Sequence, residues 1–437
     1  MRSILLLLIA SPLAAAPLEL SLKRAVQLAI SPEGSARVQL SLEALKQAQS
    51  RSGQTRAALL PDLSSAFSYS SQTRNLAAFG FKIFTIPIPG LNIPSFVGPF
   101  NVLDARVSAT QAVFDFASWR RYQASKTQVT AAKSDVGGAS EQVAGQVARA
   151  YLAAIRAEAD VTAARANVEL SEGLLKQAQN QKAAGTGTGI EVTRARVQLA
   201  NDRQRLLVAG NAQRSARLQL LRSMNLRLDT DFVLTDHLEY QPVDAVTLER
   251  AHALALKQRP DLEAQQERED SAKLSASATR LERLPSVSAF GDYGASGTGF
   301  DASLPTRTYG VSVRVPIFDG GRRDARRAES ASQYRAEKIR TEDLKEQIEL
   351  DVRLALDALR SADDQVKVAR EGLDLAESEL TQARRRYDAG VAVPLEVTDA
   401  QTRLARARDN QTAALYNYNV ARIDLAAAMG EVRRVVQ

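Results

Sequence analysis

Two short stretches of the chain repeat each other at a separation of about two hundred residues. AGTGTGIEVT contains Gly185 and AGVAVPLEVT contains Gly390, which stand 205 positions apart (390 − 185). The same register continues without a gap to Met224 and Met429 (429 − 224 = 205). Solenoid repeats have periods of about 20 to 50 residues, so we predict a chain built from two copies of one large subdomain.

We expect the first structural repeat over residues 17–228 and the second over 229–430, followed by a short C-terminal tail at 431–437. Residues 1–16 combine a basic start, an apolar run and an Ala-x-Ala site, the pattern of a secretory signal peptide. No other stretch approaches the roughly 20 apolar residues that a membrane-spanning helix requires. The mature chain is therefore expected either to be soluble or to cross a membrane in another way.

Segments with an alternation of period two predict strands with one apolar and one polar face. In TYGVSVRVPIF, from Thr308, apolar residues alternate with Gly310, Ser312 and Arg314, and LSSAFSYS, from Leu63, follows the same pattern. We expect four strands in two hairpins, at about residues 62–74, 102–114, 285–296 and 307–318. Strands of about 9 to 11 residues can cross a bilayer when tilted, whereas a small soluble sandwich sheet is the alternative. Four strands cannot close a barrel alone, and an open edge cannot face lipid.

Two very long helices are expected over residues 117–184 and 321–389, where no proline interrupts and apolar residues recur at steps of three and four. At about 1.5 Å per residue each would be on the order of 100 Å long, which no compact domain accommodates. Shorter helices are expected to stack end to end in pairs beside them, at 33–60, 191–226, 261–284 and 395–429. A long dimeric coiled coil is the alternative, but it explains neither the strands nor the signal peptide.

The composition argues against disulfides, metal sites and catalysis. Among 437 residues there are no Cys, 2 His and 3 Met, so we expect no disulfide, no transition-metal site and no cofactor. Lys and Arg alternate with Asp and Glu along the helical segments, which is typical of solvated helix faces rather than of a nucleic-acid surface. No G-x-S-x-G, P-loop or H-E-x-x-H motif occurs, so we predict that the protein is not an enzyme.

Over about residues 18–430 the chain resembles the TolC-like outer-membrane efflux proteins of Gram-negative bacteria. The resemblance rests on FDGG from Phe318, on the turn RRYDAGVAVPLEVTDAQTRL from Arg385, and on the matching turn at Gly185. It implies a mainly α fold with a membrane β-barrel, in which each subunit of a homotrimer gives four strands to one twelve-stranded barrel. The long helical hairpins would form a periplasmic α-barrel, and closure by symmetry would remove the open sheet edges.

The resemblance also implies a place in the bacterial outer membrane, with a long periplasmic portion, and a role in multidrug export or type I secretion. The implied function is passive exit for substrates that an inner-membrane pump or ABC exporter delivers through a periplasmic adaptor. Outer-membrane lipid would surround the barrel, and no nucleic acid is expected as a partner. The alternative is a structural periplasmic coiled-coil or envelope protein without channel activity. Which substrates, pump and adaptor are involved is left open by the sequence.

The hairpin tips, about residues 185–190 and 390–395, carry the expected periplasmic gate. Alignment with the family implies acidic gate positions at Glu191, Glu396 and Asp399 and a locking tyrosine at Tyr387. From the residues alone, an acidic side chain in the first turn of a helix is equally explained by the helix dipole. Ala392 stands where the family pattern has a basic residue, so the gate is expected to rely on hydrogen bonds alone or to close less tightly.

Two further sets of site residues follow from the resemblance. The tips that would contact the adaptor are Gly185, Thr186, Gly187, Gly390, Val391 and Ala392. The side chains that would line the barrel lumen are Ser64, Ser68, Ser70, Ser312 and Arg314. The first hairpin carries an additional apolar loop at 75–100, which we expect to fold over the barrel mouth or against neighbouring loops.

Overall fold

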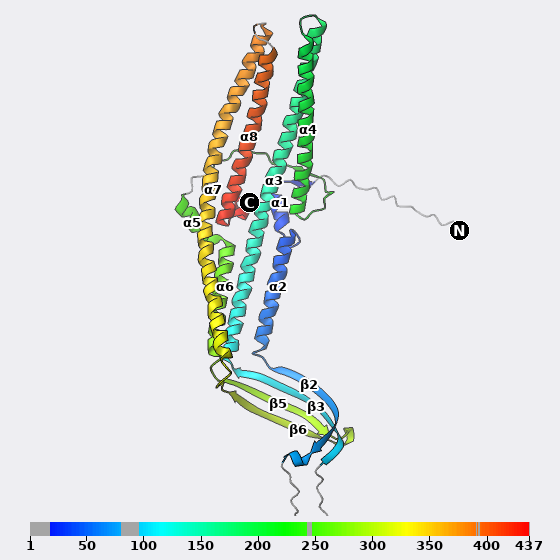
Figure 1. The fold of residues 1–437 in the computed structure, drawn as a ribbon, viewed down its shortest axis with the longest axis vertical. Helices are drawn as coiled ribbons and strands as arrows, with labels where there is room; N and C mark the ends of the chain where they lie inside the picture. Colours follow the sequence, from blue (N-terminus) through cyan, green and yellow to red (C-terminus); the bar gives the residue numbers. More distant parts are fainter. Residues whose placement is uncertain (1–17, 80–95, 243–246, 390, 392–393, 437) are drawn as a thin grey trace, which may run out of the picture. The chain divides into compact units, whose positions relative to one another are not determined.

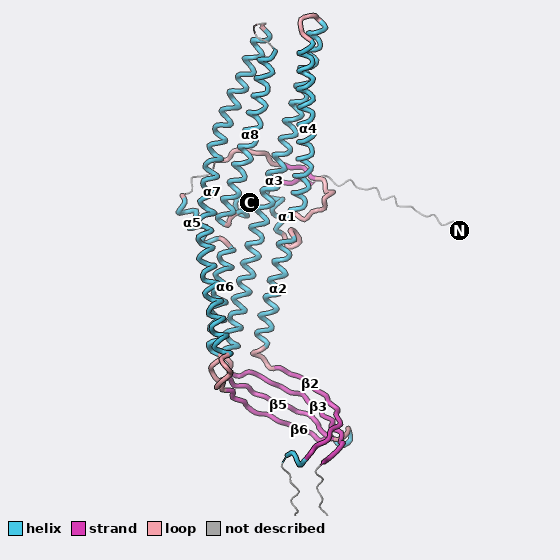
Figure 2. Tube along the Cα trace, in the orientation of Figure 1, coloured by secondary structure: helices cyan, strands magenta, loops and turns pink. Residues whose placement is uncertain are grey.

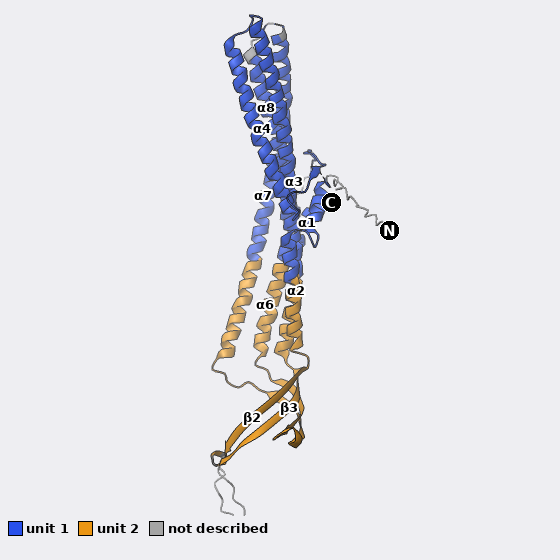
Figure 3. Ribbon diagram, turned by 90° about the vertical axis from the view of Figure 1, so that its right-hand side faces the viewer, with its two compact units in different colours: residues 1–44, 133–263, 342–437 blue, residues 45–132, 264–341 orange. Residues whose placement is uncertain are grey.

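A computed structural model describes residues 18–79, 96–242, 247–389, 391 and 394–436 (Figure 1). The chain divides into two compact units (Figure 3). Unit 1 comprises residues 1–44, 133–263 and 342–437, and unit 2 comprises residues 45–132 and 264–341. The expected signal peptide at 1–16 and the central part of the apolar loop, residues 80–95, lie outside the described residues.

The described helices are α1 (Leu22–Ile30), α2 (Ala36–Ala57), α3 (Phe116–Ala183), α4 (Gly189–Ser223), α5 (Leu248–Gln258), α6 (Pro260–Leu281), α7 (Arg322–Asp388), α8 (Pro394–Met429) and α9 (Val432–Val436). The described strands are β1 (Leu18–Leu20), β2 (Asp62–Asn75), β3 (Phe96–Phe114), β4 (Phe232–Leu234), β5 (Ser286–Gly297) and β6 (Ser303–Arg314). Two short 3-10 turns, Leu76–Phe79 and Phe300–Ala302, complete the described elements. The expectation of a mainly α chain with few strands is confirmed.

The two long helices, α3 with 68 residues and α7 with 67 residues, begin and end within one residue of the expected ranges. Neither contains a proline, so the hydrogen-bond ladder of each helix is uninterrupted. Both helices contribute to both units. Among the described residues, no helix carries an apolar stretch of the length and purity needed to cross a membrane.

Unit 2 contains an antiparallel sheet with the strand order β2-β3-β5-β6 (Figure 2). β6 ends at Arg314, four residues before the expected limit of 318, because Pro316 has no N–H to donate to a ladder. β3 begins at Phe96 rather than near residue 102. The strands β2 and β6 each have one edge without a partner within the described chain.

Unit 1 contains a core built where the two halves of the sequence meet. Tyr151 of α3 is fully buried there, and its single hydroxyl hydrogen is shared between the carbonyl of Leu20 (2.8 Å) and Asp236 Oδ2 (3.0 Å). The segment 431–437, expected as a short tail, contains α9, whose Val432 is fully buried in the same core. Arg433 on α9 pairs with Glu141 of α3 at 2.5 Å. The C-terminal segment therefore helps to hold unit 1 together.

Unit 1 also contains two helical hairpins. α7 and α8 pack through small and aliphatic side chains, with Leu380 and Ala383 of α7 against Val397 and Ala400 of α8. α3 and α4 are joined by hydrogen bonds and ion pairs, such as Ser171 Oγ to Asp202 Oδ2 at 2.5 Å. Alanine at positions 383 and 400 permits the close approach of the α7 and α8 axes that knobs-into-holes packing requires.

Candidate functional site

The turn between α3 and α4 is closed by backbone hydrogen bonds. Gly185 follows α3 with φ of +76°, a left-handed conformation that glycine adopts without strain. The N–H groups of Thr186 and Gly187 both donate to the carbonyl of Gln181 at 3.0 Å. Thr186 and Gly187, two of the expected adaptor-contacting residues, therefore lie in a turn whose backbone is fixed by the end of α3.

Glu191 lies in the first turn of α4 and caps its own helix. The carboxylate accepts a hydrogen bond from the backbone N–H of Thr188 at 2.8 Å, which satisfies one of the donors that a helix start leaves unpaired. The negative charge of Glu191 also interacts favourably with the dipole of α4, whose positive end lies at its start. Glu191 thus has a complete structural explanation in addition to the expected role at the gate.

At the second tip Glu396 lies in the first turn of α8, beside the end of α7. Arg386 of α7 places its Nε 3.5 Å from Glu396 Oε1. This basic partner was missed in the sequence, where only position 392 was considered, although three consecutive arginines precede Tyr387. Glu396 of the second tip therefore has a basic partner although position 392 is alanine. Because both side chains are more than a third exposed, the pair contributes at most about 1 kcal/mol.

Tyr387 joins the two hairpins. Its ring packs against the Leu380 cluster of α7 and α8, and its hydroxyl accepts a hydrogen bond from Nε2 of Gln181 on α3. Gln181 is the same residue whose carbonyl closes the α3–α4 turn. The structure therefore links the end of α7 to the end of α3 through one side-chain pair, and Gln181 is a candidate functional residue that the sequence analysis did not identify.

Asp399 lies three residues beyond Glu396 on α8, where residues at i and i+3 share a face, and it is exposed. Val391, at the tip, is 73 % exposed. Gly390 and Ala392, the other expected adaptor contacts of the second tip, lie outside the described residues. The tips thus bring together Glu396, Arg386, Tyr387 and Gln181, while Glu191 is engaged by its own turn.

The five expected lumen residues share one face of the sheet in unit 2. The register pairs Ser64 with Ser108, Ser108 with Asp292 and Asp292 with Thr308. Since directly opposite residues point to the same side and alternate residues share a face, Ser68 and Ser70 lie on the side of Ser64, and Ser312 and Arg314 lie on the side of Thr308. The serines of β2 and the polar residues of β6 therefore belong to a single polar face.

The same polar face carries an ion-pair cluster that the sequence analysis missed. Arg106 of β3 donates from Nε to Asp104 Oδ1 at 2.6 Å and reaches Asp292 of β5 at 3.3 Å. The signal for it was the alternation of Asp104, Arg106 and Ser108 in LDARVS, but the partner on β5 depends on the strand register.

The opposite face of the sheet is apolar and exposed. Tyr309, Val311 and Val313 of β6 are 80 %, 67 % and 60 % exposed. Phe67 and Tyr69 of β2, at the other edge of the sheet, are exposed on the same face. Exposed apolar surface of this extent marks a contact with a membrane or another protein. The sheet therefore separates an exposed apolar face from a polar one.

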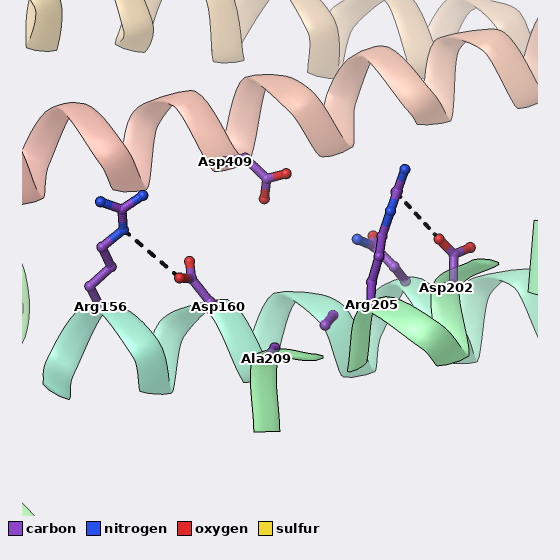
Figure 4. Close-up of a pocket in the computed structure, with 8 residues that line it drawn as sticks. Arg156, Asp160, Asp202, Arg205, Ala209 and Asp409 are labelled. Carbon is purple, nitrogen blue, oxygen red and sulfur yellow. Dashed lines mark ion pairs between the residues drawn. The ribbon is translucent and has the colours of Figure 1, made fainter. Parts of the chain in front are cut away.

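Between the hairpins of unit 1, charged side chains line a hollow of about 320 Å³ (Figure 4). Arg156 and Asp160 come from α3, Asp202 and Arg205 from α4, and Asp409 from α8. The ion pairs Arg156–Asp160 and Arg205–Asp202 span 3.8 Å and 3.5 Å. Across the described part of the chain, no group of three or more His, Cys, Asp or Glu is placed to hold a metal ion.

Two carboxyls of this hollow have perturbed acidity. Burial raises the pKa of Asp160 and is the largest effect on it. The charge of Arg156 lowers this pKa, and the like charge of Asp409 raises it, both more weakly than burial. Burial also raises the pKa of Asp409, against the opposing effect of Arg205. A carboxyl with a raised pKa binds its proton more readily in the folded state than in the unfolded state.

We expect Asp160 and Asp409 to contribute stability to the helical unit as the pH falls toward the ordinary carboxyl value of 3.8. Their contribution grows as the pH drops through the raised pKa values, because the folded state takes up protons there before the unfolded state does. It is complete below 3.8, where both states are protonated. Asp409→Asn should raise the thermal midpoint at neutral pH, by an amount equivalent to less than about 1 kcal/mol given solvent screening, and flatten this pH dependence. Circular dichroism melts of the purified protein test it, with Asp374→Asn, an exposed carboxyl of α7, as control. An unchanged pH profile in Asp409→Asn would contradict the assignment.

The sequence profile of the family described as outer membrane efflux protein matches residues 35–226 and 252–431. The first matched segment lies within the expected repeat at 17–228, and the second overlaps the expected repeat at 229–430. Together they cover well over half of the chain.

Curated relatives include the alkaline protease secretion protein AprF of Pseudomonas aeruginosa, 24 % identical over 72 % of this chain and 67 % of AprF. The probable efflux pump outer membrane protein SepC of Pseudomonas putida is 27 % identical over 65 % of this chain, and the match spans 60 % of SepC. Among solved structures, the CmeC outer membrane channel of Campylobacter jejuni superimposes with a TM-score of 0.80 at 18 % identity, over 94 % of this chain and 85 % of CmeC. At that identity the likeness concerns the fold.

Proposed function

The chain belongs to the outer membrane efflux protein family, and we propose that three copies of it form a channel that gives solutes passive exit across the periplasm and the outer membrane. Each copy contributes its four strands to one twelve-stranded barrel and its two helical hairpins to a periplasmic tunnel. An inner-membrane pump or ABC exporter supplies the energy, and a periplasmic adaptor contacts the hairpin tips at Gly185, Thr186, Gly187, Gly390, Val391 and Ala392.

The observation that carries this proposal is the two-faced sheet with open edges. In a bilayer every backbone N–H and C=O must be paired, so the free edges of β2 and β6 require strands from other copies. An even number of antiparallel strands with an apolar outer band and a polar interior is the general form of outer-membrane barrels. The exposed face of Tyr309 and Val311 then meets lipid, and the face of Ser64, Ser312 and the Arg106 cluster lines the water-filled lumen.

The proposed gate lies at the tips of unit 1. Glu396 and Asp399 supply negative charge, while Tyr387 and its partner Gln181 hold the ends of α7 and α3 together. Glu191 contributes a third carboxylate per copy, already engaged in capping α4. In this arrangement the closed tunnel attracts cations and repels anions.

Two neighbouring residues of β6 test the channel directly, because they lie on opposite faces of the same strand. Val311→Lys places a charge on the proposed lipid face, which costs about 2–4 kcal/mol near the middle of a bilayer. Ser312→Lys adds the same charge to the proposed lumen. We expect Val311→Lys to abolish insertion and single-channel conductance in planar bilayers, and Ser312→Lys to insert normally and conduct with a weaker preference for cations.

If both lysine variants conducted like the wild type, the barrel assignment would be wrong. If the wild-type protein formed no channels in bilayers, the alternative of a structural envelope protein would gain support. AprF is named for protease secretion and SepC for an efflux pump, so polypeptides and small molecules are both candidate substrates. Protease secretion and drug susceptibility in a deletion strain distinguish them.

A further inference from the structure

The two helical hairpins of unit 1 form a row that ends in α7 on one side and in α4 on the other (Figure 1). α8 packs on α7 through the Leu380 and Val397 cluster, and it reaches α3 through the ion pair Arg149–Asp424 and the ring of Tyr416 over Arg156. α4 in turn is joined to α3 by the hydrogen bonds Ser171–Asp202 and Arg203–Glu172. The helices therefore follow the order α7, α8, α3, α4, as Figure 1 shows, and the outward faces of α7 and α4 end the row.

The outward face of α7 combines exposed apolar and acidic residues in one stripe. Leu354, Val368 and Leu375 are 60 %, 68 % and 64 % exposed, and they recur at steps of seven and fourteen residues. Asp364 and Glu371 lie between them at spacings of three and four, on the same face. The residues of α7 that bury against α8, such as Val366 and Leu380, lie on the other side of the helix. We call this stripe the α7 seam.

The outward face of α4 has the same form with the opposite charge. Leu207, Val208 and Leu218 are 70 %, 60 % and 46 % exposed. Arg203 and Arg214 flank them at spacings of four, on the same face. Arg214 has no ion-pair partner within the described part of the chain, and Arg203 pairs with Glu172 at 2.8 Å with 60 % of its side chain exposed. We call this stripe the α4 seam.

The charge difference extends along α4 and along the part of α7 that lies within unit 1. α4 contains seven arginines and two carboxylates, Glu191 and Asp202, a net charge of +5 (7 − 2). Residues 342–388 of α7 contain thirteen carboxylates and eight basic residues, a net charge of −5 (8 − 13). Surfaces of equal and opposite charge, each with an apolar stripe, are complementary to each other.

The two seams also match in level. In a ring with rotational symmetry all copies stand at the same height. α4 begins at a hairpin tip and α7 ends at one. Two residues are therefore at the same height when one lies as many positions after the start of α4 as the other lies before the end of α7. Val208 is 19 positions after Gly189 and Val368 is 20 before Asp388. Arg214 is 25 positions after Gly189, and Asp364 is 24 positions before Asp388. At about 1.5 Å per residue these partners agree within one residue rise.

We propose that the α4 seam of one copy binds the α7 seam of the next, with Val208 against Val368 and an ion pair between Arg214 and Asp364. This rests on the proposed trimer, and it names the surfaces that close the ring. The contact joins two different faces, so each copy offers one free seam of each kind until the ring closes. Because Asp364 pairs only weakly with Lys367 of its own helix, at 3.5 Å, a second copy can compete for it.

Charge reversal tests the pairing. Arg214→Glu and Asp364→Arg should each weaken trimer association on the order of tenfold, and the double variant should recover most of the loss, because the ion pair is rebuilt in the opposite sense. Native mass spectrometry of the full chain in detergent measures the trimer fraction over a range of protein and salt concentrations. The losses should shrink as the salt concentration rises, since exposed charges are screened.

Cross-linking tests whether residues 208 and 368 of neighbouring copies lie at the same height. The chain has no cysteine, so Val208→Cys with Val368→Cys introduces the only two thiols, and oxidation should give covalent dimers and trimers. Val208→Cys with Leu350→Cys is the matched control, because residue 350 lies 38 positions before the end of α7 and should not cross-link. Trimers that fail to cross-link through 208 and 368, or reversals that do not compensate, would overturn the seam while leaving the channel proposal intact. If no trimer formed in the wild type, both proposals would fall.

Discussion

Glu396→Gln combined with Asp399→Asn is expected to remove most of the cation preference of the reconstituted channel. Both residues lie on one face of the first turns of α8, and Asp399 is exposed. A trimer would hold three copies of each at one constriction, where low-dielectric walls focus the field of the charges. Charged clefts of this kind raise local counter-ion concentrations about 10- to 1,000-fold, so the ratio of cation to anion permeability should fall at least several-fold.

Glu191→Gln is the matched control for this experiment. Its carboxylate accepts from the Thr188 N–H at the start of α4, and a glutamine oxygen can accept the same bond. The single change should therefore lower selectivity less than the pair on α8 does. Reversal potentials in asymmetric salt measure the selectivity of both variants and of the wild type. Unchanged selectivity in the double variant would refute the placement of Glu396 and Asp399 at the constriction.

The helical part of the fold could be predicted from the sequence because its signals are local. The absence of proline and the recurrence of apolar residues at three and four positions define α3 and α7 to within one residue. The strand limits were less accurate, since the end of β6 at Arg314 depends on how a ladder accommodates Pro316. The helical segment α9 has no strong periodic signal in five residues, and its burial depends on a core assembled from α1, α3 and α4.

The site was predictable only in part, for a related reason. Repeat alignment and family resemblance locate Tyr387, Glu396 and Asp399 along the chain, but the partners of these residues depend on how the hairpins pack. Gln181 and Tyr387 are 206 positions apart, and no local pattern links them. Arg386 was closer at hand, ten residues before Glu396, yet only the hairpin geometry makes it a partner.

The contact between Gln181 and Tyr387 leads to the second large effect. Tyr387→Phe keeps the ring that packs against the Leu380 cluster and removes only the hydroxyl that accepts from Gln181. A hydrogen bond of this kind contributes about 0.5–1.5 kcal/mol. If three such links open together, the equilibrium between closed and open tips should shift about 10-fold to 1,000-fold, because each 1.4 kcal/mol is a factor of ten. We therefore expect a marked rise in open probability in planar bilayers.

Two comparisons make this expectation specific to the link between the hairpins. Gln181→Ala should raise the open probability as Tyr387→Phe does, and the double variant should add little, since both changes remove the same bond. Tyr240→Phe is the matched control: it also deletes a hydroxyl, the one that donates to Asp363 at 2.6 Å, but Asp363 lies 25 positions before the end of α7. It should leave gating unchanged. Additive effects of the two tip variants, or an equal response of Tyr240→Phe, would mean that the hydroxyl of Tyr387 acts on gating by some route other than Gln181.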